Sequence, residues 1–60
     1  MSYEIFDQTL GHLVNEIDAY CPDEYALVDA IPWYGSYNEA ESITSLLKQN
    51  TGHEFVIRRH

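Results

Sequence analysis

The sequence predicts an α+β protein: a small single domain, residues 1–60, with the order helix–strand–helix–strand. Apolar side chains recur at steps of three and four along residues 6–21, which is the period of one helix face. A second stretch with this period follows a capping sequence, and residues 53–59 alternate between apolar and polar side chains. We therefore expect two amphipathic helices packed against a minimal sheet.

The first predicted helix begins after Ser2, whose side chain can cap it, and extends to Cys21. Its apolar face consists of Phe6, Leu10, Leu13, Val14, Ile17, Tyr20 and Cys21. Pro22 ends the helix, because the residue before a proline avoids the helical region. Gly11 lies inside this helix at a cost of about 1 kcal/mol relative to Ala. Cys21, at the end of the apolar face, is expected in the core.

Residues 22–34 allow two interpretations. Pro22 and the two acids that follow it resemble the first turn of a short helix. The apolar residues of this segment instead suit a buried strand: Tyr25, Leu27, Val28 and Ile31. We favour the strand, because the C-terminal strand needs a partner. Residues 33–38 combine aromatic and small side chains and predict a loop.

The second helix has two alternative capping boxes, Asn38 with Glu41 and Ser36 with Glu39. Its apolar stripe consists of Ala40, Ile43, Leu46 and Leu47, and it ends at residues 50–52. The strand that follows could pair in parallel with the earlier strand through a right-handed crossover. Two strands make a poor sheet, which favours dimerisation or pairing with another chain.

Charge is distributed unevenly along the chain. The formal net charge is −7, and the first 47 residues contain nine carboxylates and no Lys or Arg. The cations, Lys48, Arg58 and Arg59, all lie in the tail. An anionic surface argues against direct binding to nucleic acid or to an anionic membrane and favours a basic protein partner. A solvated acidic face that serves only solubility is the simpler alternative.

Seven residues are predicted to contact a partner. On the first predicted helix, acidic side chains share the stripe opposite the apolar face, and the connection after it adds two more. Aromatic residues of the loop supply large contact area with a polar tip. The predicted partner-binding residues are Glu4, Asp7, Asp18, Asp23, Glu24, Tyr34 and Tyr37. Trp33 is instead expected to fill the core between the helices.

The sequence has no pattern that names a reaction. It lacks the spacing of a zinc site or calcium loop and the glycine-rich phosphate-binding motifs, so we expect no catalytic residue, no metal and no cofactor. Cys21 with His12 is the one conceivable nucleophilic pair. A single Cys cannot form an internal disulfide, which fits a cytoplasmic setting. No apolar stretch is long enough to cross a membrane, and no signal peptide is evident.

A chain that is very small, acidic, poor in cysteine and equipped with the aromatic loop Trp33–Tyr37 resembles phage-encoded inhibitors of host defence, which include anti-CRISPR proteins and DNA mimics. The resemblance implies occupation of a basic nucleic-acid-binding channel in the host cytoplasm. Arg58 and Arg59 depart from it, since a pure DNA mimic does not need them.

The predicted function is therefore a non-enzymatic acidic inhibitor of a basic nucleic-acid-binding protein. The alternative is a dimeric interaction module or antitoxin-like regulator, held together by the first helix and the C-terminal strand, in which the acids only give solubility. A chain this short is marginally stable, and both self-association and partner binding would stabilise it.

Overall fold

The computed structural model describes residues 1–60 and contains three strands, two α-helices and one 3₁₀ turn. In chain order these are β1 (Tyr3–Asp7), β2 (His12–Leu13), α1 (Glu16–Tyr20), η1 (Pro22–Glu24), α2 (Tyr37–Thr51) and β3 (Phe55–Arg59). The predicted α+β class is confirmed. The predicted order of elements is wrong in the N-terminal part, because the chain begins with two strands.

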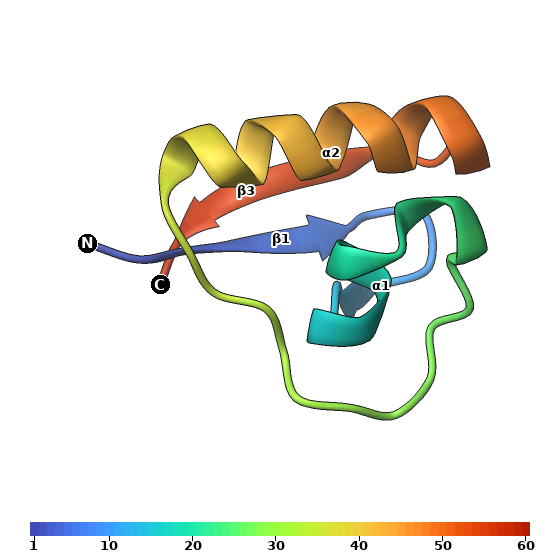
Figure 1. Ribbon diagram of the computed structural model, residues 1–60, viewed down its shortest axis with the longest axis horizontal. Helices are drawn as coiled ribbons and strands as arrows, with labels where there is room; N and C mark the ends of the chain where they lie inside the picture. The colour runs from blue at the N-terminus through green and yellow to red at the C-terminus, as the bar shows by residue number, and fades with distance from the viewer.

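The sheet has the order β2-β1-β3, and both strand pairs are antiparallel. Ile5 lies opposite Ile57 in the β1–β3 pair, and Phe6 lies opposite Leu13 in the β1–β2 pair. Helix α2 runs alongside β3 and in the opposite direction to it (Figure 1). The predicted parallel crossover is therefore wrong: the last strand pairs with the first segment of the chain, which had been expected to be helical.

The long N-terminal helix predicted for residues 2–21 does not form. Tyr3–Asp7 is a strand, and Gly11, with φ of 76°, lies in the turn that leads to β2. The same segment also fits the two-residue period of a strand. Ile5 and Asp7 are buried on one face, while Glu4 and Phe6 point to the other. Residues 3–7 pair with β3, which is far away in the sequence, and this pairing favours the strand over the helix. Of the predicted helix, only residues 16–20 are helical, and Asn15 rather than Ser2 caps them.

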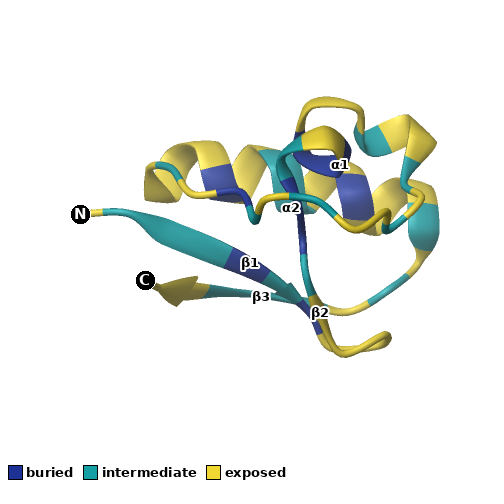
Figure 2. Cartoon of the chain, turned by 90° about the horizontal axis from the view of Figure 1, so that it is seen from below, coloured by how far each residue is buried: buried dark blue, intermediate teal, exposed yellow.

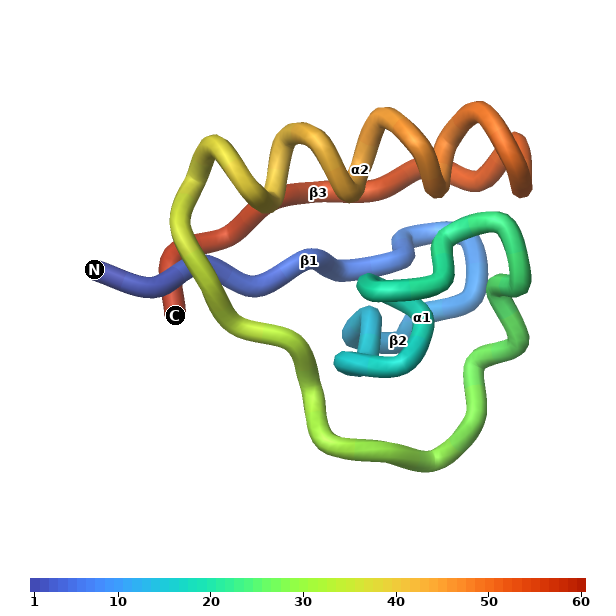
Figure 3. Tube along the Cα trace, viewed as in Figure 1, coloured from blue at the N-terminus to red at the C-terminus, as the bar shows by residue number.

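Residues 22–34 contain the short helical turn that was the alternative interpretation, and the favoured strand is absent. After η1 the chain makes a wide arc back to the start of α2 (Figure 3). Polar side chains hold this arc, because the Asp18 carboxylate accepts hydrogen bonds from the backbone N–H of Ala26 and of Leu27, both at 3.0 Å. Leu27 has a φ of 52°, a left-handed conformation that these bonds fix. Asn15 also donates to the Val28 carbonyl at 2.7 Å.

The C-terminal part follows the prediction closely. Ser36 caps α2 in a complete capping box with Glu39, so of the two predicted boxes this one forms. Gly52 ends the helix in the left-handed conformation, with a φ of 74°, and β3 follows after two residues. Local signals were sufficient here because each one acts within a turn of the helix.

The core is small and lies between the sheet and the helices (Figure 2). Its buried apolar residues are Ile5, Val14, Ala19, Trp33, Ala40 and Leu47. Trp33 is thus in the core, as predicted, whereas Cys21 is exposed and not in the core. Three of the nine buried residues are polar, Asp7, Asn15 and Asp18, so polar contacts make up an unusually large part of this interior.

Candidate functional site

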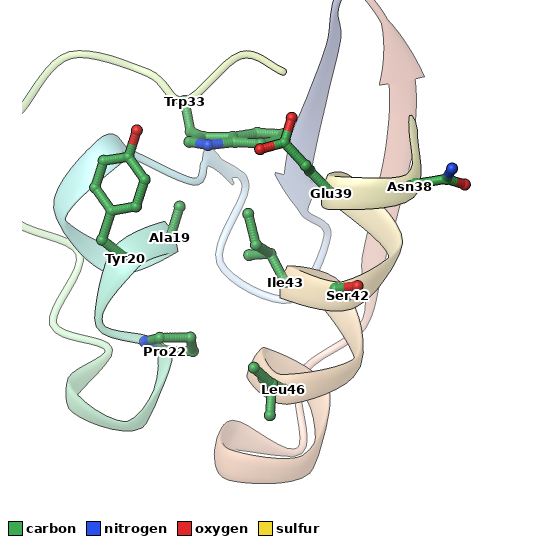
Figure 4. Close-up of a pocket in the computed structure, with 9 residues that line it drawn as sticks. All are labelled: Ala19, Tyr20, Pro22, Trp33, Asn38, Glu39, Ser42, Ile43 and Leu46. Atoms are coloured by element: carbon green, nitrogen blue, oxygen red, sulfur yellow. The ribbon is translucent and has the colours of Figure 1, made fainter. Parts of the chain in front are cut away.

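An open groove of about 480 Å³ separates α1 from α2 (Figure 4). Apolar side chains from both helices and from the loop line it, with polar residues at the first turns of α2. The lining residues are Ala19, Tyr20, Pro22, Trp33, Asn38, Glu39, Ser42, Ile43 and Leu46. The structure therefore offers one concave, largely apolar surface between its two helices.

Trp33 forms one end of this groove and is held rigidly there. Its backbone N–H donates to the Val14 carbonyl at 3.0 Å, and its side chain is 3% exposed. A Cβ atom at Gly35 would lie 2.5 Å from Cζ2 of the indole, so only glycine allows the ring to lie this close to the loop backbone. The indole is therefore closely packed at this end of the groove.

The sides of the groove are formed by large side chains that remain exposed to solvent in the folded chain. Tyr20 is 72% exposed on α1, and Leu46 is 49% exposed on α2. Adjacent Leu46 and Leu47 point about 100° apart on a helix, so only Leu47 reaches the core. Fully burying a Leu side chain contributes about 1.5–3 kcal/mol. The exposed parts of Tyr20 and Leu46 are therefore a source of binding free energy.

The charged side chains at and next to the groove are carboxylates, and no Lys or Arg lines it. Glu39 lines the groove, although its Oε1 also accepts from Ser36 Oγ at 3.0 Å. Asp23 and Glu24 directly follow the lining residue Pro22; both are exposed and neither forms an ion pair within the chain. The rim of the groove is therefore negatively charged.

The residues predicted to contact a partner do not gather on one surface. Asp7 and Asp18 are 0% and 1% exposed, so they serve the interior and present no carboxylate to a partner. Glu4 is bound by Arg58, whose Nη2 lies 2.7 Å from its Oε2. The continuous acidic stripe along a helix is therefore wrong, because residues 3–7 form a strand whose acids alternate between faces.

The two predicted aromatic anchors are exposed, as expected, but they lie outside the groove. Tyr34 is 40% exposed and stacks on the His60 ring at 3.9 Å between centroids. Tyr37 is 47% exposed and meets the edge of Tyr3 at 5.3 Å. Both rings are therefore partly engaged with the ends of the chain.

Asp7 is the centre of a buried polar cluster. Its Oδ2 accepts from the Tyr25 hydroxyl at 2.7 Å and lies 2.9 Å from His53 Nδ1, while its Oδ1 accepts from the Leu10 N–H at 3.0 Å. Burial raises the pKa of Asp7, but the hydrogen bonds from Tyr25, His53 and Leu10 outweigh it and hold the pKa below its usual value of 3.8. Burial and the bond to Asp7 raise the pKa of Tyr25.

This cluster joins the end of β1 to the chain after η1 and to the turn before β3. Each Asp7 oxygen is already bonded within the protein, and the side chain is 0% exposed. We therefore interpret the cluster as structural. Nowhere in the chain do three His, Cys, Asp or Glu side chains converge in a way that could hold a metal ion.

A second hollow, of about 550 Å³, lies between β2 and residues 27–32. Its lining includes Phe6, under the guanidinium of Arg58 at 4.3 Å, and it is more polar than the groove. None of the helices combines the length and apolar character needed to cross a bilayer. No protein family, curated protein or solved structure matches the chain, so the site rests on its own geometry.

Sequence reasoning missed the groove because it assigned Tyr20 and Leu46 to faces directed at the core. The neighbouring pair Leu46–Leu47 was a usable signal, since adjacent helical side chains point about 100° apart and one of the two can lie at the margin of the buried face. No local signal marked the Asp7 cluster, because His53 is 46 positions away.

Proposed function

We propose that this protein is a non-enzymatic acidic inhibitor that binds a basic protein, and that the groove between α1 and α2 receives an apolar side chain of that partner. The partner class we propose is a nucleic-acid-binding protein, whose phosphate-binding surface carries Arg and Lys. The observation that supports this most is an exposed, largely apolar groove whose lining contains the carboxylate of Glu39 and no Lys or Arg, with Asp23 and Glu24 directly following the lining residue Pro22.

The groove and the charge have separate roles. Apolar contact with Leu46 and Tyr20 supplies affinity, because these exposed side chains leave water on binding, while Trp33 closes one end of the groove. Asp23 and Glu24 accept hydrogen bonds from Arg or Lys that flank the inserted side chain. The net charge of −7 accelerates the encounter with a cationic partner and repels anionic competitors.

We place DNA mimicry second to this docking mode. Duplex DNA presents one charge per about 1.7 Å of axis, and a protein needs a row of free carboxylates to imitate it. Asp7 and Asp18 are buried and Glu4 is paired, so the row lacks three of the proposed charges. Inhibition then follows from occupying the partner's basic surface at one anchored point.

The test uses a designed peptide in place of the unidentified partner. The probe is an amphipathic peptide with Leu at helical spacing and Arg between the leucines, and its control replaces each Leu by Ser at equal charge. We expect calorimetry to show binding to the Leu peptide, at least about tenfold tighter than to the Ser peptide. Affinity should fall steeply with added salt, because the flanking charge pairs are exposed.

Matched variants locate the binding surface. Leu46→Ser should weaken binding about tenfold, while Val28→Ser, at a residue of similar exposure outside the groove, should not. Asp23→Asn with Glu24→Gln should remove most of the salt dependence, in contrast to Asp29→Asn with Glu41→Gln. Equal effects of both pairs, or equal binding of both peptides, would show that only net charge acts and would refute the groove.

A competition experiment tests the nucleic-acid part of the proposal. A fluorescent DNA duplex is bound to the same cationic peptide, and the protein is titrated in. Release of the duplex supports competition for a phosphate-binding surface. Formation of a ternary complex with the duplex still bound would count against inhibition of a nucleic-acid-binding partner, even if the groove binds the peptide.

A further inference from the structure

The outer edge of β3 has no partner in the fold. The strand order β2-β1-β3 leaves β3 at one margin of the sheet. The corresponding edge of β1 is covered, because β2 pairs with its end and Gly35 exchanges two hydrogen bonds with Tyr3, at 2.7 and 3.1 Å. In Figure 1, β3 runs along this margin beside α2. The sheet is therefore open on one side.

The hydrogen bonds at the two ends of the β1–β3 pair show which backbone groups of β3 face outward. Gln8 donates to the Glu54 carbonyl at 2.8 Å, and His60 donates to the Ser2 carbonyl at 3.0 Å, so even-numbered residues of this segment bond to β1. The N–H and C=O groups of Phe55, Ile57 and Arg59 consequently point away from β1. A row of unpaired donors and acceptors is a template for another strand.

We propose that a second copy of this chain pairs with this edge, antiparallel, about a two-fold axis at Ile57. In that register Ile57 lies opposite Ile57 of the partner subunit, and Phe55 lies opposite Arg59 of the partner subunit. Glu54 lies opposite His60 of the partner subunit, so no two acidic side chains meet at the ends of the pairing. The two sheets then form one continuous antiparallel sheet.

The charge pattern and the length of the strand together favour this register. Arg58 and Arg59 face Val56 and Phe55 of the partner subunit, so no two like charges lie opposite each other. An axis at Arg58 or at Arg59 would set two arginines against each other. An axis at Val56 would also avoid like charges, with Arg58 opposite Glu54 of the partner subunit, but it would pair only residues 55–57 of the two strands, whereas the axis at Ile57 pairs all five residues of β3. Self-complementarity of this kind is what a two-fold interface requires.

The helix above the strand has the same complementarity. Lys48 Nζ lies 3.9 Å from Glu54 Oε2, so this flank of α2 faces the β3 side, and Glu41, two turns earlier, lies on the same flank. Ile57 is about 10 Å along the strand from Glu54, and the midpoint between Glu41 and Lys48 is about 10 Å along the helix from Thr51. The axis at Ile57 would therefore bring Glu41 near Lys48 of the partner subunit.

The groove residues Ser42, Leu46 and Glu39 lie on the other flank of α2, so dimerisation leaves the groove open. The dimer thus stands independently of the proposed inhibitor function. It also fits the alternative function of a dimeric interaction module, now with β3 rather than the first helix as the element that joins the subunits.

The first experiment measures the mass of the full chain in solution by sedimentation equilibrium from micromolar to millimolar concentration. We expect a dimer. Arg59→Pro should weaken it at least about tenfold, because proline removes an outward N–H and is tolerated on an edge strand. Arg59→Ala keeps the N–H and should leave the dimer intact. A monomer throughout, or equal dimerisation of both variants, would overturn the proposal.

A cross-linking experiment covers the case in which Arg59→Pro fails to fold. Cys21→Ser removes the exposed native thiol, and Ile57→Cys places two thiols opposite each other across the axis, about 5.5 Å apart at Cα. With oxidised glutathione as oxidant, we expect a disulfide-linked dimer. Val56→Cys in the same background should cross-link far less, because the two residues are diagonal neighbours. Equal cross-linking at both positions would refute the register.

Discussion

Residues 1–36 and residues 37–60 are stabilised in different ways. All three buried polar residues, Asp7, Asn15 and Asp18, belong to the first part, whereas the buried residues of the second part are the apolar Ala40 and Leu47. The first part contains two strands, a five-residue helix and a long arc, and the second contains a fifteen-residue helix and one strand. A small core therefore supports irregular chain only where buried hydrogen bonds replace regular ones.

The largest expected effect is at Asp7, where the two parts meet. Asp7→Ala leaves the Tyr25 hydroxyl, His53 Nδ1 and the Leu10 N–H without their acceptor. We expect a loss of about 3 kcal/mol in the free energy of unfolding, a large share of the total for a chain this short. Urea denaturation measures it. Tyr25→Phe removes one of these bonds and should cost about 1 kcal/mol; equal losses would mean that Asp7 is not the centre of the cluster.

The pH dependence of stability tests the same group without changing its size. Because the folded-state pKa of Asp7 is lowered, its contribution is fully present above the usual value of 3.8 and is lost as pH falls through the folded value. Stability should therefore decline more steeply in acid for the natural protein than for Asp7→Asn. The other carboxylates are common to both proteins. An equally steep decline of stability with falling pH in both proteins would contradict the ionised, hydrogen-bonded state of Asp7.

The difference between the two parts also explains what the sequence could predict. The capping box at Ser36, the glycine stop at Gly52 and the alternation of β3 act between near neighbours, and all three were readable. The strand at Tyr3–Asp7 depends on pairing with β3, whose residues are 48 to 56 positions away in the sequence, and a helix-like spacing of apolar residues masked it. Local patterns specify an element only when its stabilising contacts are local.

The candidate site was less predictable than the fold, for the same reason. A groove arises between α1 and α2, and its lining comes from three separate segments. The sequence shows that the chain is acidic, but it does not show which carboxylates reach solvent. Asp7 is buried because of the face of β1 on which it lies, and Asp18 is buried because it binds the arc after η1. Asp18 looks like a surface acid in the sequence and is instead the anchor of that arc.

A smaller effect is expected at Asp18, inside the first part. Asp18→Ala leaves two backbone N–H groups without acceptors and frees Leu27 from its left-handed conformation. We expect a loss of about 2 kcal/mol, with faster hydrogen exchange at Ala26 and Leu27 and unchanged exchange in α2. Asp29→Ala, at an exposed position of the same arc, is the matched control. Uniformly faster exchange throughout the chain would show that the arc is not a separate unit.

The smallest effect is expected at the start of α2 and tests whether the second part is specified by local signals. Ser36 Oγ accepts from the Glu39 N–H at 3.2 Å, and Glu39 Oε1 accepts from the Ser36 N–H at 3.2 Å. Ser36→Ala removes the first bond, together with the exposed bond from Ser36 Oγ to Glu39 Oε1, and should cost about 1 kcal/mol in thermal or urea denaturation. Asn38→Ala removes the alternative cap residue, which lies inside the helix, and should leave stability unchanged. If Asn38→Ala costs as much as Ser36→Ala, the helix begins later in solution, and Glu39, which lines the groove, would lose its fixed position.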